Sequence, residues 1–310
     1  MEIWDLVIVG GGPAGLAAGI YGARSGLKTL VLEEKMAGGT TLDAPLVENY
    51  PGLQNIGGME LAQKLAAHCR SSGVEVREFE GVSGLELKGA RKIVKTNKNA
   101  YEAGAIIIAS GAHYRAIDVP GEKEFHGRGV SLCALCDGPL FKGKRALVVG
   151  GGNSAIMTAL YLAELASEVK IVHRRDAFRA EAALVKDLEA RKNIEVLWNS
   201  EIREIKGERT VSKVTLFNSR SGEIKEMSID GVFVQIGQDP NSQLAGEAGV
   251  VVDEYGYVIV DCLQRTNIAG VYAAGDITNH PVKQVGTAVG QGITAAVEAH
   301  GYIRRPYYKQ

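Results

Sequence analysis

The feature that most constrains the fold of this chain is a glycine-rich unit that occurs twice. Each copy reads as an apolar run, a glycine turn, a helix and a second apolar run. The glycine turns are residues 10–15 (GGGPAG) and 150–155 (GGGNSA), and they lie 140 residues apart. The two copies align at that offset without a gap. A repeated strand–turn–helix–strand unit predicts an α/β chain with two Rossmann-like dinucleotide-binding domains.

The pattern of apolar residues predicts the elements of each copy. In the first copy we expect a strand at residues 6–9, a helix at 16–24 and a strand at 29–32. The second copy has the same elements at residues 146–149, 156–165 and 169–172. A lone G-x-G-x-x-G is a weak indication of nucleotide binding, because it also fits an ordinary tight turn. Two copies, each between a strand and a helix, indicate nucleotide binding.

Each glycine of the motif has its own physical role. In the first copy, Gly10 permits the tight turn, Gly12 lets the backbone approach a pyrophosphate at the helix N-terminus, and Gly15 lets the helix pack on the strand. The second copy has Gly150, Gly152 and Ala155 at these positions.

The two copies differ at the end of their second strand. Glu33 ends this strand in the first copy, where a carboxylate suits a ribose diol and predicts FAD or NAD. In the second copy His173, Arg174 and Arg175 follow, with Arg179 four residues later. Arginines at this place predict a 2′-phosphate, and therefore NADP(H). The alternative is a solvated basic face, which would be the better interpretation of the same arginines outside this motif.

A second motif is the pair Cys133 and Cys136, which lies 14 residues before Gly150. One alternative is half of a zinc site, but Cys69, in a helical stretch, and Cys262, in a strand-like segment, stand alone. A chance pair of buried thiols is the other alternative. The position beside a nucleotide loop favours a redox disulfide, and a helix beginning at the motif would favour the thiolate.

Length, charge and cysteine content limit the kinds of protein that this chain can be. The chain has 310 residues, which fits about two domains. The net charge of −1 gives no reason to expect nucleic acid or a charged membrane surface as a partner. We find no apolar run of the ~18 residues that a membrane helix needs, and no signal peptide. The lack of a signal peptide predicts a cytoplasmic protein. Four cysteines do not make a disulfide scaffold, and because there is no second C-x-x-C we expect no metal site.

Taken together, these motifs resemble those of the low-molecular-weight thioredoxin reductases, of the bacterial and archaeal type, within the flavin-containing pyridine nucleotide-disulfide oxidoreductases. The resemblance covers nearly the whole chain. It is carried, in order, by residues 10–15, 48–52, 109–112, 133–138, 150–155, 173–176, 178–180 and 270–276.

The resemblance implies a three-layer architecture in which an NADPH domain is inserted into an FAD domain. We therefore expect an FAD domain at 1–113 and 245–310, and an NADPH domain with the dithiol at 114–244. The family also implies a homodimer and rotation of one domain against the other about the two connections.

The resemblance also implies binding residues. Those for FAD are Gly10, Gly12, Pro13, Ala14, Gly15, Glu33, Asn49, Gly111, Asp276 and Gln284. Those for NADPH are Gly150, Gly152, Asn153, Ser154, Ala155, His173, Arg174, Arg175 and Arg179. The chain departs from the family pattern at Thr40, Met157, Thr158 and Lys283.

The implied activity is electron transfer from NADPH through FAD and the Cys133–Cys136 disulfide to thioredoxin or a thioredoxin-like protein. Cys136 would face the flavin and form the charge-transfer thiolate, Cys133 would attack the partner, and Asp137 would act as acid and base. Three alternatives stay open: another donor (NADH or ferredoxin), a glutaredoxin-like or peroxiredoxin-system partner, or a flavin-loaded redox sensor.

Overall fold

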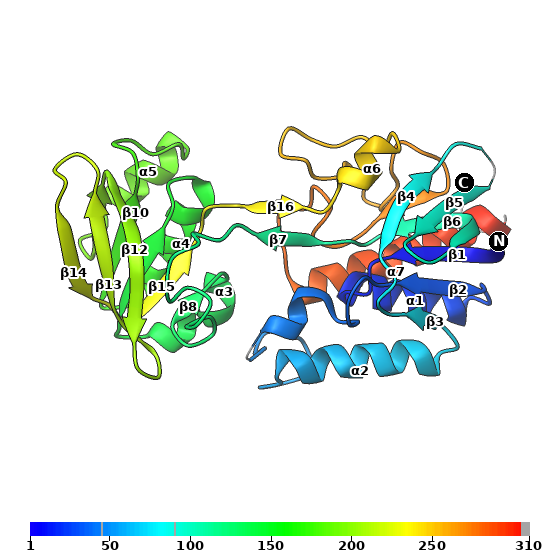
Figure 1. Cartoon of the computed structure of the whole chain (residues 1–310), viewed down its shortest axis with the longest axis horizontal. Helices are drawn as coiled ribbons and strands as arrows, with labels where there is room; N and C mark the ends of the chain where they lie inside the picture. Colours follow the sequence, from blue (N-terminus) through cyan, green and yellow to red (C-terminus); the bar gives the residue numbers. More distant parts are fainter. Residues whose placement is uncertain (45, 90, 305–310) are drawn as a thin grey trace. The chain divides into compact units, whose positions relative to one another are not determined.

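The computed structural model describes residues 1–44, 46–89 and 91–304, and the chain divides into two compact units. Unit 1 consists of Met1–His113 and Asp239–Gln310, and unit 2 of Tyr114–Gln238 (Figure 1). The last six residues of the expected FAD domain, 305–310, lie outside the described residues.

The sequence predicts the end of the inserted domain at residue 244, whereas in the structure unit 2 ends at Gln238. The connecting strands β7 (Ala112–Tyr114) and β16 (Gln238–Pro240) pair with each other. Just beyond β16, the Asn241 backbone N–H donates to the Gly111 carbonyl at 3.0 Å, and the Asn241 amide donates to the Ser110 carbonyl at 2.8 Å. These bonds attach the segment after β16 to unit 1.

A largely parallel sheet forms the centre of unit 1. Its order is β3-β2-β1-β6-β5-β4, with β17 also paired to β6, and the pairs among β1, β2, β3, β6 and β17 are parallel. The strands are β1 (Glu2–Val9), β2 (Thr29–Leu32), β3 (Glu75–Arg77), β4 (Val82–Glu86), β5 (Lys92–Thr96), β6 (Ala100–Ile108) and β17 (Val271–Ala273). The strands β2 and β17 are buried throughout, which explains why they read as continuous apolar runs rather than as alternating patterns.

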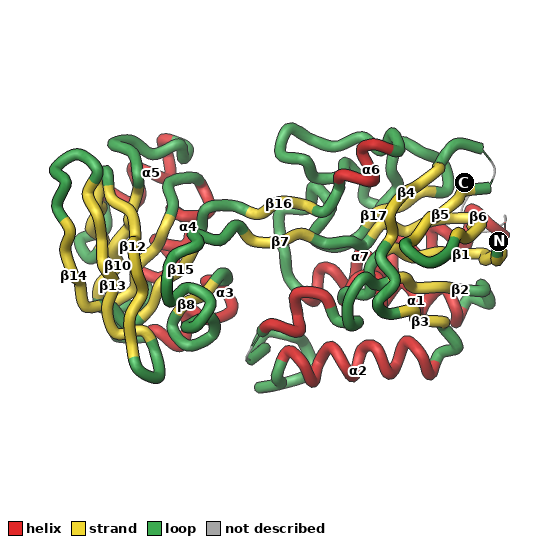
Figure 2. Tube along the Cα trace, in the orientation of Figure 1, coloured by secondary structure: helices red, strands yellow, loops and turns green. Residues whose placement is uncertain are grey.

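Different elements cover the two faces of this sheet. On one face pack the helices α1 (Pro13–Arg24), α2 (Gly58–Ser71) and α7 (Val285–Arg304), which share a core with β1 (Figure 2). The other face carries a second core, which includes residues of β4 and β5 and of the short helix α6 (Gln243–Glu247). A 3-10 helix, η1 (Gly39–Asp43), lies before α2.

Unit 2 has a five-stranded parallel sheet between a helical layer and a small antiparallel sheet. The large sheet is ordered β11-β10-β9-β15-β8 and the small one β12-β13-β14. The strands are β8 (Val130–Ser131), β9 (Arg145–Val149), β10 (Glu168–His173), β11 (Ile194–Trp198), β12 (Ser200–Gly207), β13 (Val211–Asn218), β14 (Ile224–Ser228) and β15 (Gly231–Val234). The helical layer holds α3 (Ala134–Asp137), η2 (Gly138–Phe141), α4 (Asn153–Ala163) and α5 (Ala182–Glu189).

These observations confirm the expected α/β class. Both motif helices begin three residues earlier than predicted, at Pro13 and Asn153, because the preceding glycine is extended and acts as the N-cap. One local expectation was wrong: Cys262 lies in a turn and not in a strand. The Asp261 carboxylate accepts backbone hydrogen bonds from Leu263 and Arg265, which closes that turn.

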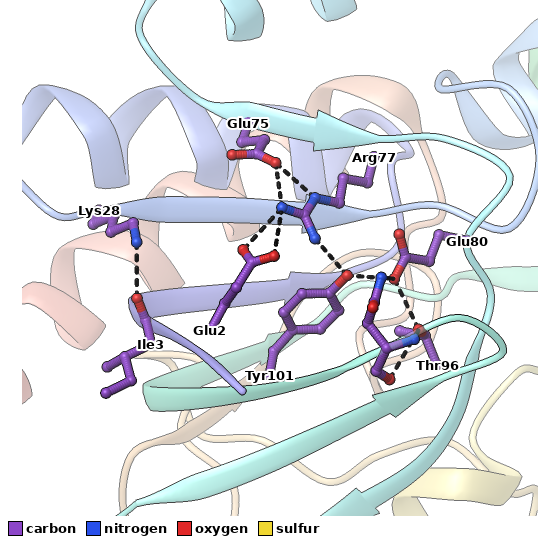
Figure 3. A network of polar contacts seen from close by, with 9 residues as sticks. Glu2, Ile3, Lys28, Glu75, Arg77, Glu80, Thr96 and Tyr101 are labelled. Carbon is purple, nitrogen blue, oxygen red and sulfur yellow. Dashed lines mark hydrogen bonds and ion pairs between the residues drawn. The ribbon is translucent and has the colours of Figure 1, made fainter.

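A polar network joins the edge strand β3 to the rest of the sheet in unit 1 (Figure 3). The Arg77 guanidinium donates to Glu2 and to the Tyr101 hydroxyl, and that hydroxyl donates to Glu80. Burial raises the pKa of Glu80, but its hydrogen bonds to Tyr101, Thr96 and Asn99 bring the pKa below its usual value. The buried carboxylate accepts three hydrogen bonds at its Oε1, which offset the cost of its burial.

Contact between the backbones of α1 and α7 joins the N-terminal and C-terminal segments of unit 1. A Cβ at Gly292 would lie 2.1 Å from the Ala14 carbonyl oxygen, far inside van der Waals contact. Only glycine allows α7 to approach α1 this closely.

We expect Gly292→Ala to lower the free energy of unfolding by about 1–3 kcal/mol, because the added methyl must push the two backbones apart. Gly290→Ala in the same helix is the matched control, since a Cβ there meets nothing within 4 Å. The control should stabilise the helix by about 0.5–1 kcal/mol. Urea unfolding followed by circular dichroism measures both, and equal effects would contradict the packing argument.

Candidate functional site

The first glycine loop joins β1 to α1 by a turn that only glycine permits. Gly10 has φ +107°, and a Cβ there would lie 2.3 Å from the Ala109 carbonyl oxygen. A Cβ at Gly15 would lie 1.9 Å from the Gly10 carbonyl oxygen, so the helix packs directly on the end of the strand. No side chain caps the N-terminus of α1, which leaves its first N–H groups available to an anion.

The middle glycine of each loop is not required by the protein itself. A Cβ at Gly152 would meet nothing within 4 Å, and one at Gly12 would meet only Gly39 Cα, at 3.8 Å. Both residues are extended, with φ −100° and −74°, which any residue can adopt. Each position therefore leaves open the space that a Cβ would fill, at a helix N-terminus. This is the space that a pyrophosphate needs, so both loops fit a dinucleotide.

Two backbone donors hold Glu33 beside the first loop. Its Oε2 accepts the Gly11 N–H at 2.7 Å, and its Oε1 accepts the Lys35 N–H at 2.9 Å. The Glu33 carbonyl in turn accepts the N–H of Glu80, which belongs to the polar network of Figure 3. The carboxylate is therefore fixed at the end of β2, where a ribose hydroxyl would bind.

The turn after β17 lies against the same loop. A Cβ at Gly275 would be 2.9 Å from the Ala14 Cβ, and the Gly275 N–H donates to the buried Gln291 side chain at 2.6 Å. The next residue, Asp276, is a half-buried carboxyl. Burial raises the pKa of Asp276, and the nearby Lys283 opposes this.

Lys283 joins this turn to the segment that carries Gln284. Its Nζ donates to the Asp276 carbonyl at 3.0 Å and to the Thr278 carbonyl, and it lies 4.2 Å from the centre of the Tyr257 ring. Burial lowers the pKa of Lys283, while Asp276 and Asp253 raise it.

Asn49 and Gln284 are 235 residues apart in the chain, yet the Asn49 amide donates to the Gln284 side-chain oxygen at 3.0 Å. The structure thus places two predicted flavin contacts side by side. Gly111, another predicted contact, has open space at its Cβ position and lies in the connection to β7.

In unit 2 the loop after β10, residues 174–181, folds onto the second glycine loop. The Arg179 N–H donates to the Gly151 carbonyl at 2.8 Å. The side chains of Arg174, Arg175 and Arg179 are exposed, and within the described residues no carboxylate pairs with them. Exposed guanidinium groups beside a pyrophosphate loop fit a 2′-phosphate.

His173 lies beneath this loop rather than on its surface. It is 5% exposed, its ring stacks on Phe178 with centroids 5.7 Å apart, and Nε2 lies 3.1 Å from the Ala177 carbonyl oxygen. Burial lowers the pKa of His173, the Ala177 carbonyl raises it, and the three neighbouring arginines lower it further. His173 therefore packs beneath the loop that carries the arginines, through contacts with Ala177 and Phe178.

The sequence did not predict one residue of this site, Glu181. Its carboxylate accepts the Asn153 side-chain amide at 2.8 Å, and its N–H donates to the Asn153 Oδ1 at 2.9 Å. Both ends of the Asn153 side-chain amide are thus held by Glu181. Spacing could not reveal this pair, because the two residues are 28 positions apart on different elements.

Cys133 and Cys136 form a disulfide at the start of α3, with Cα atoms 5.3 Å apart. The Cys133 Sγ is the N-cap of α3 and accepts the Cys136 N–H at 3.2 Å. The Cys133 N–H donates to the Ser131 hydroxyl at 3.1 Å, which anchors the preceding turn. A donor directed at the Cys133 sulfur favours negative charge there when the disulfide opens. Leu135, between the cysteines, is 60% exposed.

The other two cysteines lie apart from the dithiol and differ in exposure. Cys69 is buried in α2, and burial raises its pKa to about 12, whereas Cys262 is exposed. In the part of the chain that the structure describes, no three His, Cys, Asp or Glu residues cluster as metal ligands. Within the same residues, no helix has the length and apolar character to span a bilayer.

Known proteins are similar to this chain in sequence and in structure. Residues 4–292 match the family model described as pyridine nucleotide-disulphide oxidoreductase. The chain is 42% identical to a thioredoxin reductase of Bacillus subtilis, over 97% of this chain and 95% of the relative. It is 41% identical to a 34.2 kDa protein in the rubredoxin operon of Clostridium pasteurianum, over 96% and 97%. The crystal structure of thioredoxin reductase from Streptococcus pyogenes superposes with a TM-score of 0.94 at 38% identity, covering 98% of this chain and 99% of that one.

We expect the four thiols to react in three classes with Ellman's reagent near pH 8. The oxidised native protein should expose only Cys262, and reduction should add Cys133 and Cys136. Cys69 should react only after unfolding, because its buried thiol does not ionise near this pH. If Cys69 reacted in the native protein as fast as Cys262, the burial argument would be wrong.

Proposed function

The chain belongs to the pyridine nucleotide-disulphide oxidoreductase family, and we propose that it is an NADPH-dependent thioredoxin-disulfide reductase. One observation carries this proposal: a closed Cys133–Cys136 disulfide lies in the unit whose glycine loop is flanked by three exposed arginines. Electrons would pass from NADPH through FAD and this disulfide to thioredoxin or a thioredoxin-like protein.

Unit 1 is the proposed FAD domain. The open space at Gly12, the uncapped N-terminus of α1 and the fixed Glu33 carboxylate support binding of the pyrophosphate and the adenosine ribose. Asp276 would bind the ribityl chain, and the Asn49–Gln284 pair would lie near the flavin ring. The remaining proposed contacts are Gly10, Pro13, Ala14, Gly15 and Gly111.

Unit 2 is the proposed NADPH domain. The N-terminus of α4 would bind the pyrophosphate through backbone N–H groups, and Arg174, Arg175 and Arg179 would bind the 2′-phosphate. The buried His173 would support the arginines from below. The other proposed contacts are Gly150, Gly152, Asn153, Ser154 and Ala155.

When bound, FAD supplies the two-electron chemistry that links NADPH to the disulfide. After reduction, the Cys133 thiolate attacks one sulfur of the partner's disulfide and forms a mixed disulfide, releasing the partner's second sulfur as a thiolate. The Cys136 thiolate then attacks Cys133, which re-forms the internal disulfide and releases the reduced partner. Asp137 donates the proton that the leaving thiolate needs. The N–H of Cys136 supports the nucleophile, because it is directed at the Cys133 sulfur.

Two further parts of the proposal rest on the family and on thiol chemistry. We propose a homodimer, as in the family that the chain resembles. We also propose a cytoplasmic location, since a dithiol that cycles and an exposed free Cys262 suit a reducing compartment.

We expect anaerobic NADPH to bleach the yellow flavin absorption of the purified protein within seconds. Cys133→Ser should abolish thioredoxin turnover but leave this bleaching intact, because a serine hydroxyl cannot attack a disulfide while the donor and flavin sites are unchanged. Stopped-flow absorbance and an insulin-coupled thioredoxin assay measure the two properties, and Cys262→Ser is the control for loss of a thiol.

Different outcomes identify the alternatives. Bleaching by NADH or by reduced ferredoxin, but not by NADPH, would change the donor. Turnover with a glutaredoxin-like partner only would change the acceptor. Bleaching without turnover of any disulfide partner, together with redox-dependent complex formation, would indicate a sensor.

Donor choice has its own test. Arg174→Ala should lower kcat/KM for NADPH about 10- to 100-fold, because it removes a charged hydrogen bond to the 2′-phosphate, and should leave the value for NADH unchanged. Arg220→Ala, which removes an exposed arginine in the turn between β13 and β14, is the control. Equal losses for NADPH and NADH would contradict the proposed role of Arg174.

A further inference from the structure

The loop that carries the arginines is attached to the glycine loop and to its own base by backbone and side-chain contacts. At its start, the ring of His173 contacts the Ala177 carbonyl and lies directly under Gly151, where a Cβ would be 2.2 Å from the ring. In its middle, the Arg179 N–H donates to the Gly151 carbonyl. At its end, Glu181 pairs with Asn153.

The pair at the end of the loop differs from the others because one of its two hydrogen bonds joins two side chains, while the other uses the Glu181 backbone N–H. We call it the Asn153–Glu181 bridge. The Asn153 amide uses its nitrogen and its oxygen at once, at 2.8 Å to the carboxylate and 2.9 Å from the Glu181 N–H. Asn153 is the first residue of α4, and Glu181 directly precedes α5. The bridge therefore joins the helix that faces the pyrophosphate to the end of the loop that carries the arginines.

Stability does not explain this bridge well. Glu181 is exposed, and exposed polar pairs contribute little to folding because water competes for their groups. A carboxylate near two sites for phosphate groups also repels the ligand. Its benefit must therefore lie in geometry: two hydrogen bonds fix the distance and direction between the two phosphate sites.

We propose that Glu181 is a positioning residue that couples the two phosphate sites of unit 2. This inference rests on the proposed binding of NADPH and extends it to a residue outside the nucleotide motif. By holding the end of the arginine loop on α4, the bridge keeps Arg174, Arg175 and Arg179 at the distance from the pyrophosphate that a 2′-phosphate requires. The preference for NADP over NAD then depends on Glu181, although the arginines make the contact.

The test compares the binding of NADP⁺ and NAD⁺ to the flavin-loaded enzyme, because these ligands differ only in the 2′-phosphate. Isothermal titration calorimetry gives both dissociation constants without turnover. Glu181→Ala should reduce the ratio of the NAD⁺ to the NADP⁺ dissociation constant by about 5-fold or more, which is a typical coupling between sites. Glu181→Gln keeps the acceptor oxygen and the N–H, so it should retain the preference.

Glu189→Ala is the matched control, because Glu189 is an exposed carboxylate on α5 outside the bridge. It should leave the ratio unchanged. The proposal is overturned if Glu181→Ala weakens both ligands equally, or if Glu181→Gln changes the ratio as much as the alanine variant does, since the charge alone would then act.

Failure of the proposed function is visible separately. A wild-type protein that binds NADP⁺ no better than NAD⁺ would refute NADPH as the donor before any variant is compared. A wild type with a clear preference that survives in Glu181→Ala would refute only the coupling.

Discussion

The architecture of unit 1 depends on contacts between backbones that leave no room for a Cβ atom. The position of Gly15 against the Gly10 carbonyl seats α1 on the end of β1, and the position of Gly292 against the Ala14 carbonyl seats α7 on α1. The turn that contains Asp276 precedes α7 in the chain, so the packing of α7 on α1 places this turn at the start of α1. Residues from opposite ends of the chain thus form one candidate cofactor site, because two helices approach closely enough to do so.

The two glycine loops form the same type of strand-to-helix turn but differ in the charge of the side chains beside it. In unit 1, backbone donors fix a carboxylate, Glu33, where a diol would bind and a phosphate would be repelled. In unit 2 the same place carries arginines, and beneath their loop lies His173, whose pKa burial lowers. In the proposed assignment, charge at one strand end distinguishes the nucleotides of the two loops, while the turn and the helix N-terminus suit any pyrophosphate.

The buried polar groups of unit 1 support its site without taking part in chemistry. Glu80, Tyr101 and Arg77 satisfy one another in the sheet, and the Glu80 N–H reaches the Glu33 carbonyl (Figure 3). Gln291 and Lys283 satisfy the backbone of the Asp276 turn from two sides. Networks of this kind fix backbone positions because any movement would leave a buried polar group without a partner.

The sequence by itself determined the features that act through neighbours in the chain. Both strand–turn–helix units, the α/β class and the pairing of Cys133 with Cys136 follow from local rules: a glycine allows a tight turn, an apolar run becomes a buried strand, and two intervening residues let a small disulfide ring close. The helix starts were predicted three residues late, because apolar periodicity does not detect an N-cap glycine.

Only the tertiary structure decided which distant residues meet. The Asn49–Gln284 contact, the burial of His173 and the Asn153–Glu181 bridge join residues whose spacing carries no signal. The hydrogen bonds that attach Asn241 to unit 1, just after the boundary at Gln238, likewise join segments far apart in the chain. Such contacts arise from how whole helices and strands pack, and a single sequence records the packing surfaces but not their partners.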